Sequence, residues 1–323
     1  MSQVIDNSSV AIMQEQYSNF IVENLPEIML PQGFTRNVSE FASGKELLIP
    51  TIGTVTLQDA AEGVPLDFRP IDTGRVNLTI TEQVGDAWSV SDDLKEDGYL
   101  VNQLMAGRAA ESARAIAEEF ETKFLATCNS VQTSNGSNLV NGAMHRLTAS
   151  GANRTMGLDD FRYMKYSFDK AKVRQAGRIA IVDPIVEMCL NGLMGTQWVS
   201  NNPQFSGIIT EGFAQDHKFV ANIFGFDIYT SNLLPTVGVE GALKDWDGTT
   251  KASVAGDVAN VFMSVADEQS VPIMHAMRRQ PSVSGWRDNE ERKDKYQVTT
   301  RYGFGAQRLD TLATIITSST DFV

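Results

Sequence analysis

Hydrophobic and polar residues alternate between Arg75 and Thr81, where Val76, Leu78 and Ile80 are the apolar positions. This period of two predicts a strand with one exposed face. A second strand is predicted upstream, in the stretch KELLIPTIG. About twenty residues with no helical period connect the two strands, and connections of this length in a compact domain are usually functional.

The alternation of the first strand breaks near its end. Ile52 and Val55 lie out of phase on either side of Gly53, which predicts a β-bulge. Apolar residues beside charges at the tip of the hairpin suit a contact with another chain. The tip combines the acidic residues Asp59, Glu62 and Asp67 with the apolar residues Val64, Leu66 and Phe68.

The longest helical pattern covers about residues 99–128, roughly 45 Å at 1.5 Å per residue. Its expected apolar stripe recurs mostly every three or four residues, at Leu100, Leu104, Ala109, Ala113, Ile116, Phe120 and Phe124. A shorter amphipathic pattern covers residues 10–21. Because an isolated helix of that length is marginal, it must pack on another surface.

From about residue 155 the pattern becomes α/β. An amphipathic helix is expected around residues 161–171, followed by the buried strand RIAIV. Asp183 and Pro184 then supply an N-cap and a first-turn proline for another helix. The last part is β-rich: in YQVTTRYGFGA every second residue is expected on one face, and TLATIIT follows as a further strand.

Composition makes this a globular chain with a strong acidic excess. It has 323 residues, 42% of them hydrophobic, and a formal net charge of −13 from 40 acids and 27 bases. Such a balance repels phosphate and disfavours a nucleic-acid coat. No apolar run is long enough to cross a bilayer, and the first residues lack a signal-peptide pattern, so a cytosolic product is expected.

No residue pattern in the chain predicts catalysis or a cofactor. The three histidines, His145, His217 and His275, show no metal-ligand spacing. GFGAQR lacks the third glycine of a dinucleotide loop and lies within a strand pattern. Cys128 and Cys189 are expected to be free, buried thiols. No cofactor, metal or enzyme activity is therefore expected.

Three stretches carry a resemblance to a known family. They are GKELLIPTIG…VPLDFRPIDTGRVNLTITEQVGDAWSVSDDL, the helical LVNQLMAGRAAESARAIAEEFETKFLAT and the closing VTTRYGFGAQRLDTLATI. In this order and texture the chain resembles the major capsid proteins of tailed bacteriophages, which have the Hong Kong 97-type fold. The resemblance implies an α+β fold and a virion component, assembled in the host bacterial cytoplasm, that forms the icosahedral head shell.

The resemblance also implies a division of the chain. The expected segments are an N-terminal arm at 1–44, an extended loop at 45–84, a peripheral domain with a long spine helix at 85–154, an axial domain at 155–280, and peripheral return strands at 281–323. The hairpin is then long because the surface that it binds belongs to a neighbouring subunit.

The implied partners are other copies of the chain, in pentamers and hexamers, together with a portal and an optional decoration protein. The chain begins almost directly with the arm, so a separate scaffolding protein is expected. Double-stranded DNA would be enclosed without sequence-specific binding, and no membrane is involved. Residues 46–84 contain no lysine, so no covalent cross-link from this loop is expected.

Two surfaces are expected to make the contacts between subunits. The first is the tip of the extended loop, and the second is the charged stretch WRDNEERKDK, for which a solvated turn is the alternative. The candidate contact residues are Asp59, Glu62, Val64, Leu66, Phe68 and Arg69 on the loop, with Trp286, Arg287, Glu290 and Arg292 in the charged stretch.

Two other functions fit the same sequence. An encapsulin-like compartment shell would share the fold and enclose cargo enzymes in place of a genome. A cytosolic α/β enzyme would carry an unrecognised site in residues 155–280. A monodisperse monomer with a small-molecule pocket would favour the enzyme, and nucleic acid in purified particles would favour the capsid.

Overall fold

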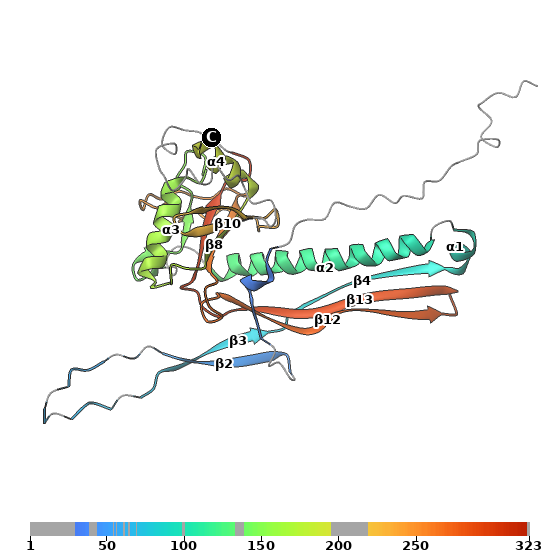
Figure 1. Ribbon diagram of the computed structural model, residues 1–323, viewed down its shortest axis with the longest axis horizontal. Helices are drawn as coiled ribbons and strands as arrows, with labels where there is room; N and C mark the ends of the chain where they lie inside the picture. Colours follow the sequence, from blue (N-terminus) through green and yellow to red (C-terminus); the bar gives the residue numbers. More distant parts are fainter. Residues whose placement is uncertain are drawn as a thin grey trace, which may run out of the picture.

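The structure is a computed structural model of the chain, shown in Figure 1. It describes residues 30–38, 44–53, 55, 57–60, 62–63, 65–68, 70–98, 101–132, 139–194 and 219–321. The amphipathic pattern expected at residues 10–21 lies outside the described residues. Among the described helices, none is long and apolar enough to cross a membrane.

A long, narrow sheet forms one part of the molecule. In the described residues it has four strands in the order β1 (Arg36–Asn37), β12 (Ile273–Asp288), β13 (Lys293–Ala306) and β4 (Glu82–Ser91). β1 is parallel to β12, and the other pairs are antiparallel. β12 and β13 extend together far beyond the short strand expected from VPIMHAM, and their turn carries the charged stretch.

A long helix lies along one face of this sheet (Figure 1). α1 (Asp92–Asp97) starts where β4 ends, because Ser91 Oγ accepts a hydrogen bond from the amide of Leu94 at 3.3 Å. α2 (Val101–Val131) follows and has 31 residues, close to the expected 99–128.

The expected apolar stripe of α2 is only partly buried. Ile116 and Phe124 are buried, whereas Leu104 and Ala113 are exposed. Phe120 packs against the rings of Tyr302 and Phe304 of β13, with centroid separations of 5.1 and 4.9 Å. The C-terminal half of the helix is therefore anchored by aromatic packing, while part of its expected stripe remains uncovered.

The hairpin expected between residues 45 and 81 is confirmed as β2 (Glu46–Ile52) and β3 (Thr73–Thr79). The two strands pair antiparallel without a register shift from Glu46↔Thr79 to Ile52↔Thr73. The bulge expected at Gly53 is therefore wrong: the strand simply ends at Ile52, and the loss of alternation marks the start of the long loop. The expected alternation on β3 is correct, with Leu78 and Ile80 buried.

The second part of the molecule is a compact body around a mixed sheet. The described strands have the order β7 (Arg146–Thr148), β14 (Leu312–Thr317), β11 (Val258–Ser264), β8 (Arg178–Val182), β10 (Phe226–Thr230) and β9 (Phe219–Ile223). Two short strands, β5 (Leu139–Val140) and β6 (Ala143–Met144), pair separately. A 3₁₀ turn at Gln32–Phe34 precedes β1.

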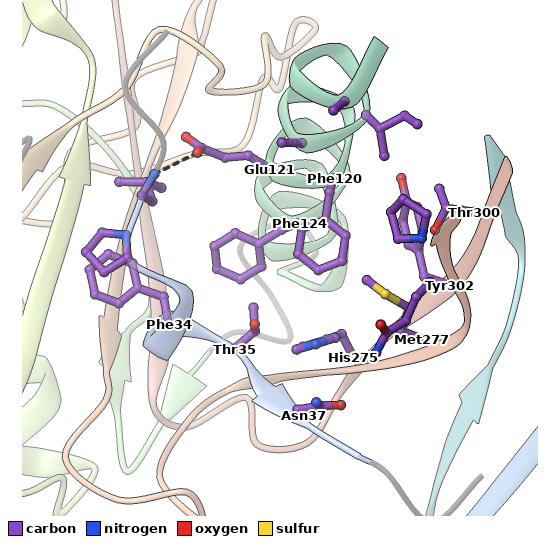
Figure 2. A pocket seen from close by; sticks show the side chains of 17 residues that line it. Phe34, Thr35, Asn37, Phe120, Glu121, Phe124, His275, Met277, Thr300 and Tyr302 are labelled. Atoms are coloured by element: carbon purple, nitrogen blue, oxygen red, sulfur yellow. Dashed lines mark hydrogen bonds between the residues drawn. The ribbon is translucent and has the colours of Figure 1, made fainter. Parts of the chain in front are cut away.

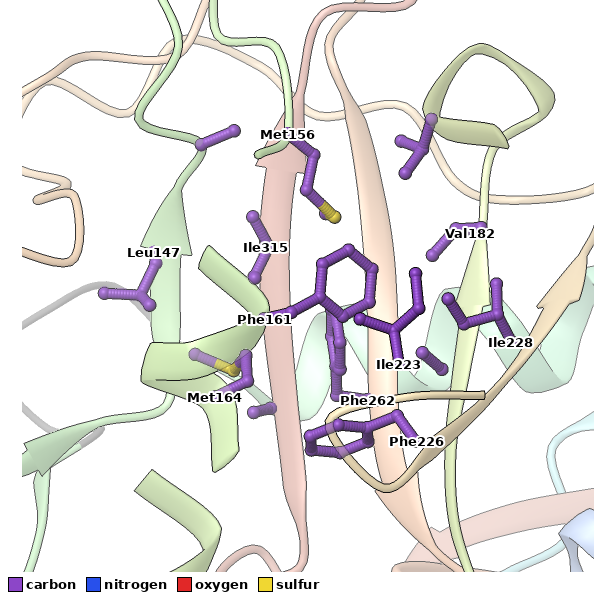
Figure 3. Close-up of a cluster of buried hydrophobic side chains, with 14 of the residues drawn as sticks. Leu147, Met156, Phe161, Met164, Val182, Ile223, Phe226, Ile228, Phe262 and Ile315 are labelled. Atoms are coloured by element: carbon purple, nitrogen blue, oxygen red, sulfur yellow. The ribbon is translucent and has the colours of Figure 1, made fainter. Parts of the chain in front are cut away.

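The core of the body is aromatic and aliphatic (Figure 3). α3 (Leu158–Lys170) directs Phe161 onto Phe262 of β11, and Phe226 of β10 meets the same ring; both centroid separations are 5.4 Å. α4 (Pro184–Met194) begins as expected, because Asp183 Oδ2 accepts a hydrogen bond from the amide of Ile185 at 3.1 Å.

The two sheets do not follow the expected segment boundaries. β14 lies between β7 and β11 in the sheet of the body, so the expected segment 281–323 is divided between both sheets. β12 begins before residue 280 and already belongs to the long sheet there. The reason is long-range pairing, which the local hydrophobic pattern does not contain.

Candidate inter-subunit surfaces

The base of the hairpin is firmly seated on the long sheet. Leu78 of β3 is 0% exposed and packs with Met274 and Ala276 of β12. A Cβ atom placed on Gly303 of β13 would lie 2.3 Å from the carbonyl oxygen of Thr79. Only a glycine allows this backbone approach, so the sequence of β13 fixes where the hairpin leaves the molecule.

Beyond the paired strands, the loop is held together by hydrogen bonds between its two sides. The amide of Gly53 donates to the carbonyl of Asp72 at 2.8 Å. Further out, the side chain of Gln58 donates to the carbonyl of Asp67 and accepts from its amide, at 2.9 and 3.0 Å. The two sides of the loop are thus tied together far from the body.

Large apolar side chains lie exposed along this loop. Phe68 is 99% exposed, and burying a phenyl ring of this kind is worth about 1.5–3 kcal/mol. Several large apolar side chains exposed on one loop are typical of an interaction site. The exposed apolar residues of the hairpin include Ile52, Val55, Leu57, Leu66, Phe68 and Ile71.

The loop candidates named from the sequence are placed as follows. Asp59, Glu62, Leu66 and Phe68 are all exposed on the distal loop. The other two loop candidates, Val64 and Arg69, lie outside the described residues.

The second group of candidates lies at the turn between β12 and β13. Trp286 is 49% exposed. The guanidinium of Arg287 donates to both carboxylate oxygens of Asp92, at 2.8 and 2.6 Å, and to Asp294 at 3.2 Å. These hydrogen bonds, with the nearby positive charge, lower the pKa of Asp92. Arg287 therefore joins the turn to α1 within one chain.

Glu290 and Arg292 complete this turn and are exposed. The amide of Glu290 donates to Asp288 Oδ1 at 3.0 Å, and Arg292 has a positive φ of 51°. Figure 1 shows this turn and the free end of the β2–β3 hairpin at opposite ends of the molecule. The structure therefore brings together the candidates within each group but keeps the two groups apart.

A further exposed surface was missed in the sequence. On β4, the odd positions from Gln83 to Ser89 are exposed, whereas the even positions turn toward α2, as Asp86 does in its ion pair with Arg108 at 2.7 Å. The outward positions are small or polar, including Gly85, Ala87 and Ser89. The alternation in VGDAWSVS was the available signal.

A cavity of about 680 Å³ lies on the other face of the long sheet, between α2, β12, β13 and the segment 30–37 (Figure 2). Phe34, Phe120, Phe124, Met277 and Tyr302 give it a largely apolar lining. The hairpin base lies on the opposite face, because Met274 and Ala276 alternate along β12 with the cavity-lining His275 and Met277.

A buried serine–histidine pair in the body resembles part of a catalytic site. Ser167 Oγ lies 3.0 Å from His145 Nδ1. Both residues are almost fully buried, and burial lowers the pKa of His145. In this conformation neither side chain is open to a substrate. Within the described residues, no three acidic, histidine or cysteine side chains form a group that could hold a metal ion.

Comparisons with known proteins agree with this architecture. A family model described as phage capsid protein matches residues 76–316, well over half of the chain. A search of curated proteins found no match.

Solved structures with a similar fold are capsids. The mature capsid of bacteriophage PhiM1 is 15% identical with a TM-score of 0.70, covering 99% of this chain and 97% of that chain. The capsid of cyanophage P-SCSP1u is 14% identical with a TM-score of 0.66, covering 95% and 93%. The capsid of a native GTA particle is 9% identical with a TM-score of 0.61, covering 99% and 100%.

Proposed function

The chain belongs to the phage capsid protein family, and from this premise we propose that its copies tile the closed icosahedral head shell around double-stranded DNA. Membership of this family makes the chain a structural component of the virion and not an enzyme. The α/β enzyme considered from the sequence is thereby set aside.

One observation supports the tiling role most strongly. The hairpin extends beyond the body and exposes Leu57, Leu66, Phe68 and Ile71, which have no surface of their own chain to cover them within the described structure. Leaving such side chains in water forgoes stabilisation that a second copy can supply. The loop therefore serves as one half of a heterologous contact, which closes into rings when repeated.

The outward face of the long sheet is the proposed other half of this contact. Arg279 of β12 lies directly opposite Arg301 of β13, and facing like charges destabilise a strand pair. The loop of a neighbour carries Asp59, Glu62 and Asp67, which would neutralise these arginines. Small outward residues on β4 leave room for it.

The finer assignments extend the same proposal. Residues 1–44 would form the arm, 45–84 the extended loop, 85–154 the peripheral domain with its spine helix, 155–280 the axial domain, and 281–323 the return strands. Two strands cross these boundaries: β12 begins before residue 280, and β14 returns to the sheet of the body. Trp286, Arg287, Glu290 and Arg292 would contact neighbours at the far end of the long sheet. Pentamers and hexamers of the chain, a scaffolding protein, a portal and a decoration protein are the proposed partners.

The shell would enclose the DNA without binding it tightly. The net charge of −13 disfavours counterion-releasing contacts with phosphates. Non-covalent contacts would hold the shell together, since residues 46–84 lack a lysine. Many modest contacts for each subunit suffice, because closure makes them act together.

Substitution of Phe68 tests the proposal. Phe68→Ser should raise the concentration needed for particle formation at least tenfold, because about 1.5–3 kcal/mol of burial is lost at each contact. Phe68→Leu, at the same position, keeps an apolar side chain and should assemble nearly as the parent does. Electron microscopy and sedimentation of purified protein provide the readout. Assembly of Phe68→Ser at the parent concentration would contradict the proposed role of the loop.

A further inference from the structure

The cavity beside α2 has the features of a binding site. Its walls come from three separate elements: Phe120 and Phe124 from α2, Met277 and Tyr302 from the long sheet, and Phe34 from the segment before β1 (Figure 2). The cavity has a volume of about 680 Å³ and is open to solvent along α2, where Ala113 and Ala117 are exposed. An open apolar hollow of this kind lets a further segment bury apolar surface.

Two polar atoms in the walls point to the chemistry of that occupant. Tyr302 is 1% exposed, yet its hydroxyl has no hydrogen-bond partner in the described part of the chain, and the same holds for Nδ1 of His275. An unsatisfied buried polar group costs about 1–3 kcal/mol. Burial and the nearby carboxylates raise the pKa of Tyr302 to about 12, so its hydroxyl stays protonated and can donate. The occupant should thus be apolar and carry hydrogen-bond acceptors.

The chain itself arrives at this cavity. Leu30 lines it, and the amide of Leu30 is held by Glu121 Oε2 of α2 at 2.8 Å. The 29 residues before Leu30 contain no lysine or arginine. They include the amphipathic pattern at 10–21, and their backbone carbonyls and side-chain amides supply uncharged acceptors.

The surface of α2 beside the cavity suits a second helix. Ala113 and Ala117 line the cavity and are exposed. Ala106 and Ala110 are also exposed and continue this line toward the start of α2, at spacings of four, three and four residues. Residues with this spacing share one face of a helix, and small side chains permit close approach of a neighbouring segment.

We propose that the cavity and the adjoining alanine face of α2 are the docking site for residues 10–29 of the same chain. Attachment at Leu30 gives this segment a high effective concentration at the site, which favours it over a segment from another copy. The extended loop is not the occupant in its own chain, because the base of the hairpin lies on the opposite face of the sheet. Docking would cover the cavity and supply an acceptor to Tyr302.

Proteolysis of the full chain tests this docking. A glutamate-specific protease is the probe, since residues 10–29 contain Glu15, Glu23 and Glu27. Cleavage after these residues is followed by intact mass in unassembled subunits, so the result does not depend on shell formation. Ala117→Arg places a charge in the cavity wall and should speed cleavage about tenfold, a loss of protection equal to about 1.4 kcal/mol.

Two further variants make the test specific. Ala115→Arg, exposed on α2 but outside the cavity, should cleave at the parent rate. Tyr302→Phe removes only the hydroxyl and should speed cleavage severalfold if the docked segment accepts its hydrogen bond. Circular dichroism establishes that each variant is folded.

The docking assignment would be overturned by rapid cleavage of the parent subunit or by equal rates in Ala117→Arg and Ala115→Arg. Protection that arises only in assembled particles would also overturn it, because the occupant would then be a second copy. Since each result comes from subunits or particles that have already formed, none of them decides whether the chain builds a shell.

Discussion

The body and the outlying hairpins of this protein differ in how far their strands are buried within one chain. Every residue of β8, β11 and β14 is buried, so these three strands of the body's sheet are covered within one chain. Along β12, by contrast, residues 279–287 are all exposed, and the free end of the β2–β3 hairpin is equally bare. The contrast is the one expected if the body is stable by itself and the exposed hairpins make the proposed contacts with neighbouring subunits.

Charged residues follow the same division. In the body, Arg178 is 1% exposed and donates to Asp169 and to the carbonyl of Val173, at 2.6 and 2.7 Å. At the β12–β13 turn, the side chain of Arg287 is 46% exposed although it has two carboxylate partners. Buried charges depend on their partners, and exposed pairs contribute little.

Truncation of aromatic rings should separate the two regions most strongly. Phe262→Ala removes the ring that meets Phe161 and Phe226, and it should lower the free energy of unfolding by about 3–5 kcal/mol. Phe68→Ala should change it by less than about 0.5 kcal/mol in the unassembled subunit. Urea denaturation of both variants measures this, and equal losses would remove the distinction between body and hairpin.

Replacement of Arg178 in the body and of Arg287 at the β12–β13 turn should give the same contrast in stability, with a smaller effect. Arg178→Met leaves the buried carbonyl of Val173 without this donor and should cost about 1–3 kcal/mol, whereas Asp169 is partly exposed and can be solvated. Arg287→Met should leave the urea midpoint of the subunit close to that of the parent, because its ion pairs are exposed to solvent. A large shift for Arg287→Met would show that the turn contributes to subunit stability.

A buried carboxyl makes the body sensitive to pH. Burial raises the pKa of Asp160 to about 6, despite hydrogen bonds from Ser150 and from the amide of Gly157. Because the folded state favours the protonated form, this contribution is complete below about pH 4 and is lost as the pH rises through 6. The loss should be on the order of 2 kcal/mol.

Asp160→Asn is the matched control for this pH effect. The amide does not titrate, so the difference in unfolding free energy between parent and variant should change across pH 4–7. Denaturation at several pH values measures it. Parallel pH profiles for the two proteins would assign the effect to other groups.

The contact between the base of the hairpin and β13 offers the test with the smallest expected effect. Gly303→Ala would push a Cβ atom against the backbone of Thr79 and should cost about 1–2 kcal/mol. At Gly305 the nearest atom, 2.9 Å away, belongs to the flexible Leu78 side chain, so Gly305→Ala should cost less. Hydrogen exchange of β3 should increase in Gly303→Ala. An unchanged exchange rate would mean that the base of the hairpin can shift on β13 without loss of protection in β3.

Regular local patterns of hydrophobic and polar residues correctly predicted several elements. The alternation at Val76, Leu78 and Ile80, the long helix, and the cap at Asp183 are all confirmed. Each depends on residues close together in sequence, which is why one sequence suffices.

Features that depend on distant segments were not predictable in the same way. The full length of β12 was missed, because past Arg278 it is paired on one edge only and has no buried face to create a pattern. β14 was expected with the return strands but pairs with β7 and β11. The contact candidates that the structure describes are exposed, as expected. The sequence did not reveal that Arg287 already binds Asp92, which lies almost 200 residues away.

The central claim is that sister subunits cover the exposed side chains of the hairpin. Electron cryomicroscopy of particles assembled from the purified chain tests it most directly. The account predicts Leu66 and Phe68 of one subunit packed on the outward face of β4, β13 and β12 of the next. Particles in which these two side chains remain in solvent, or a chain that stays monomeric at high concentration, would contradict it.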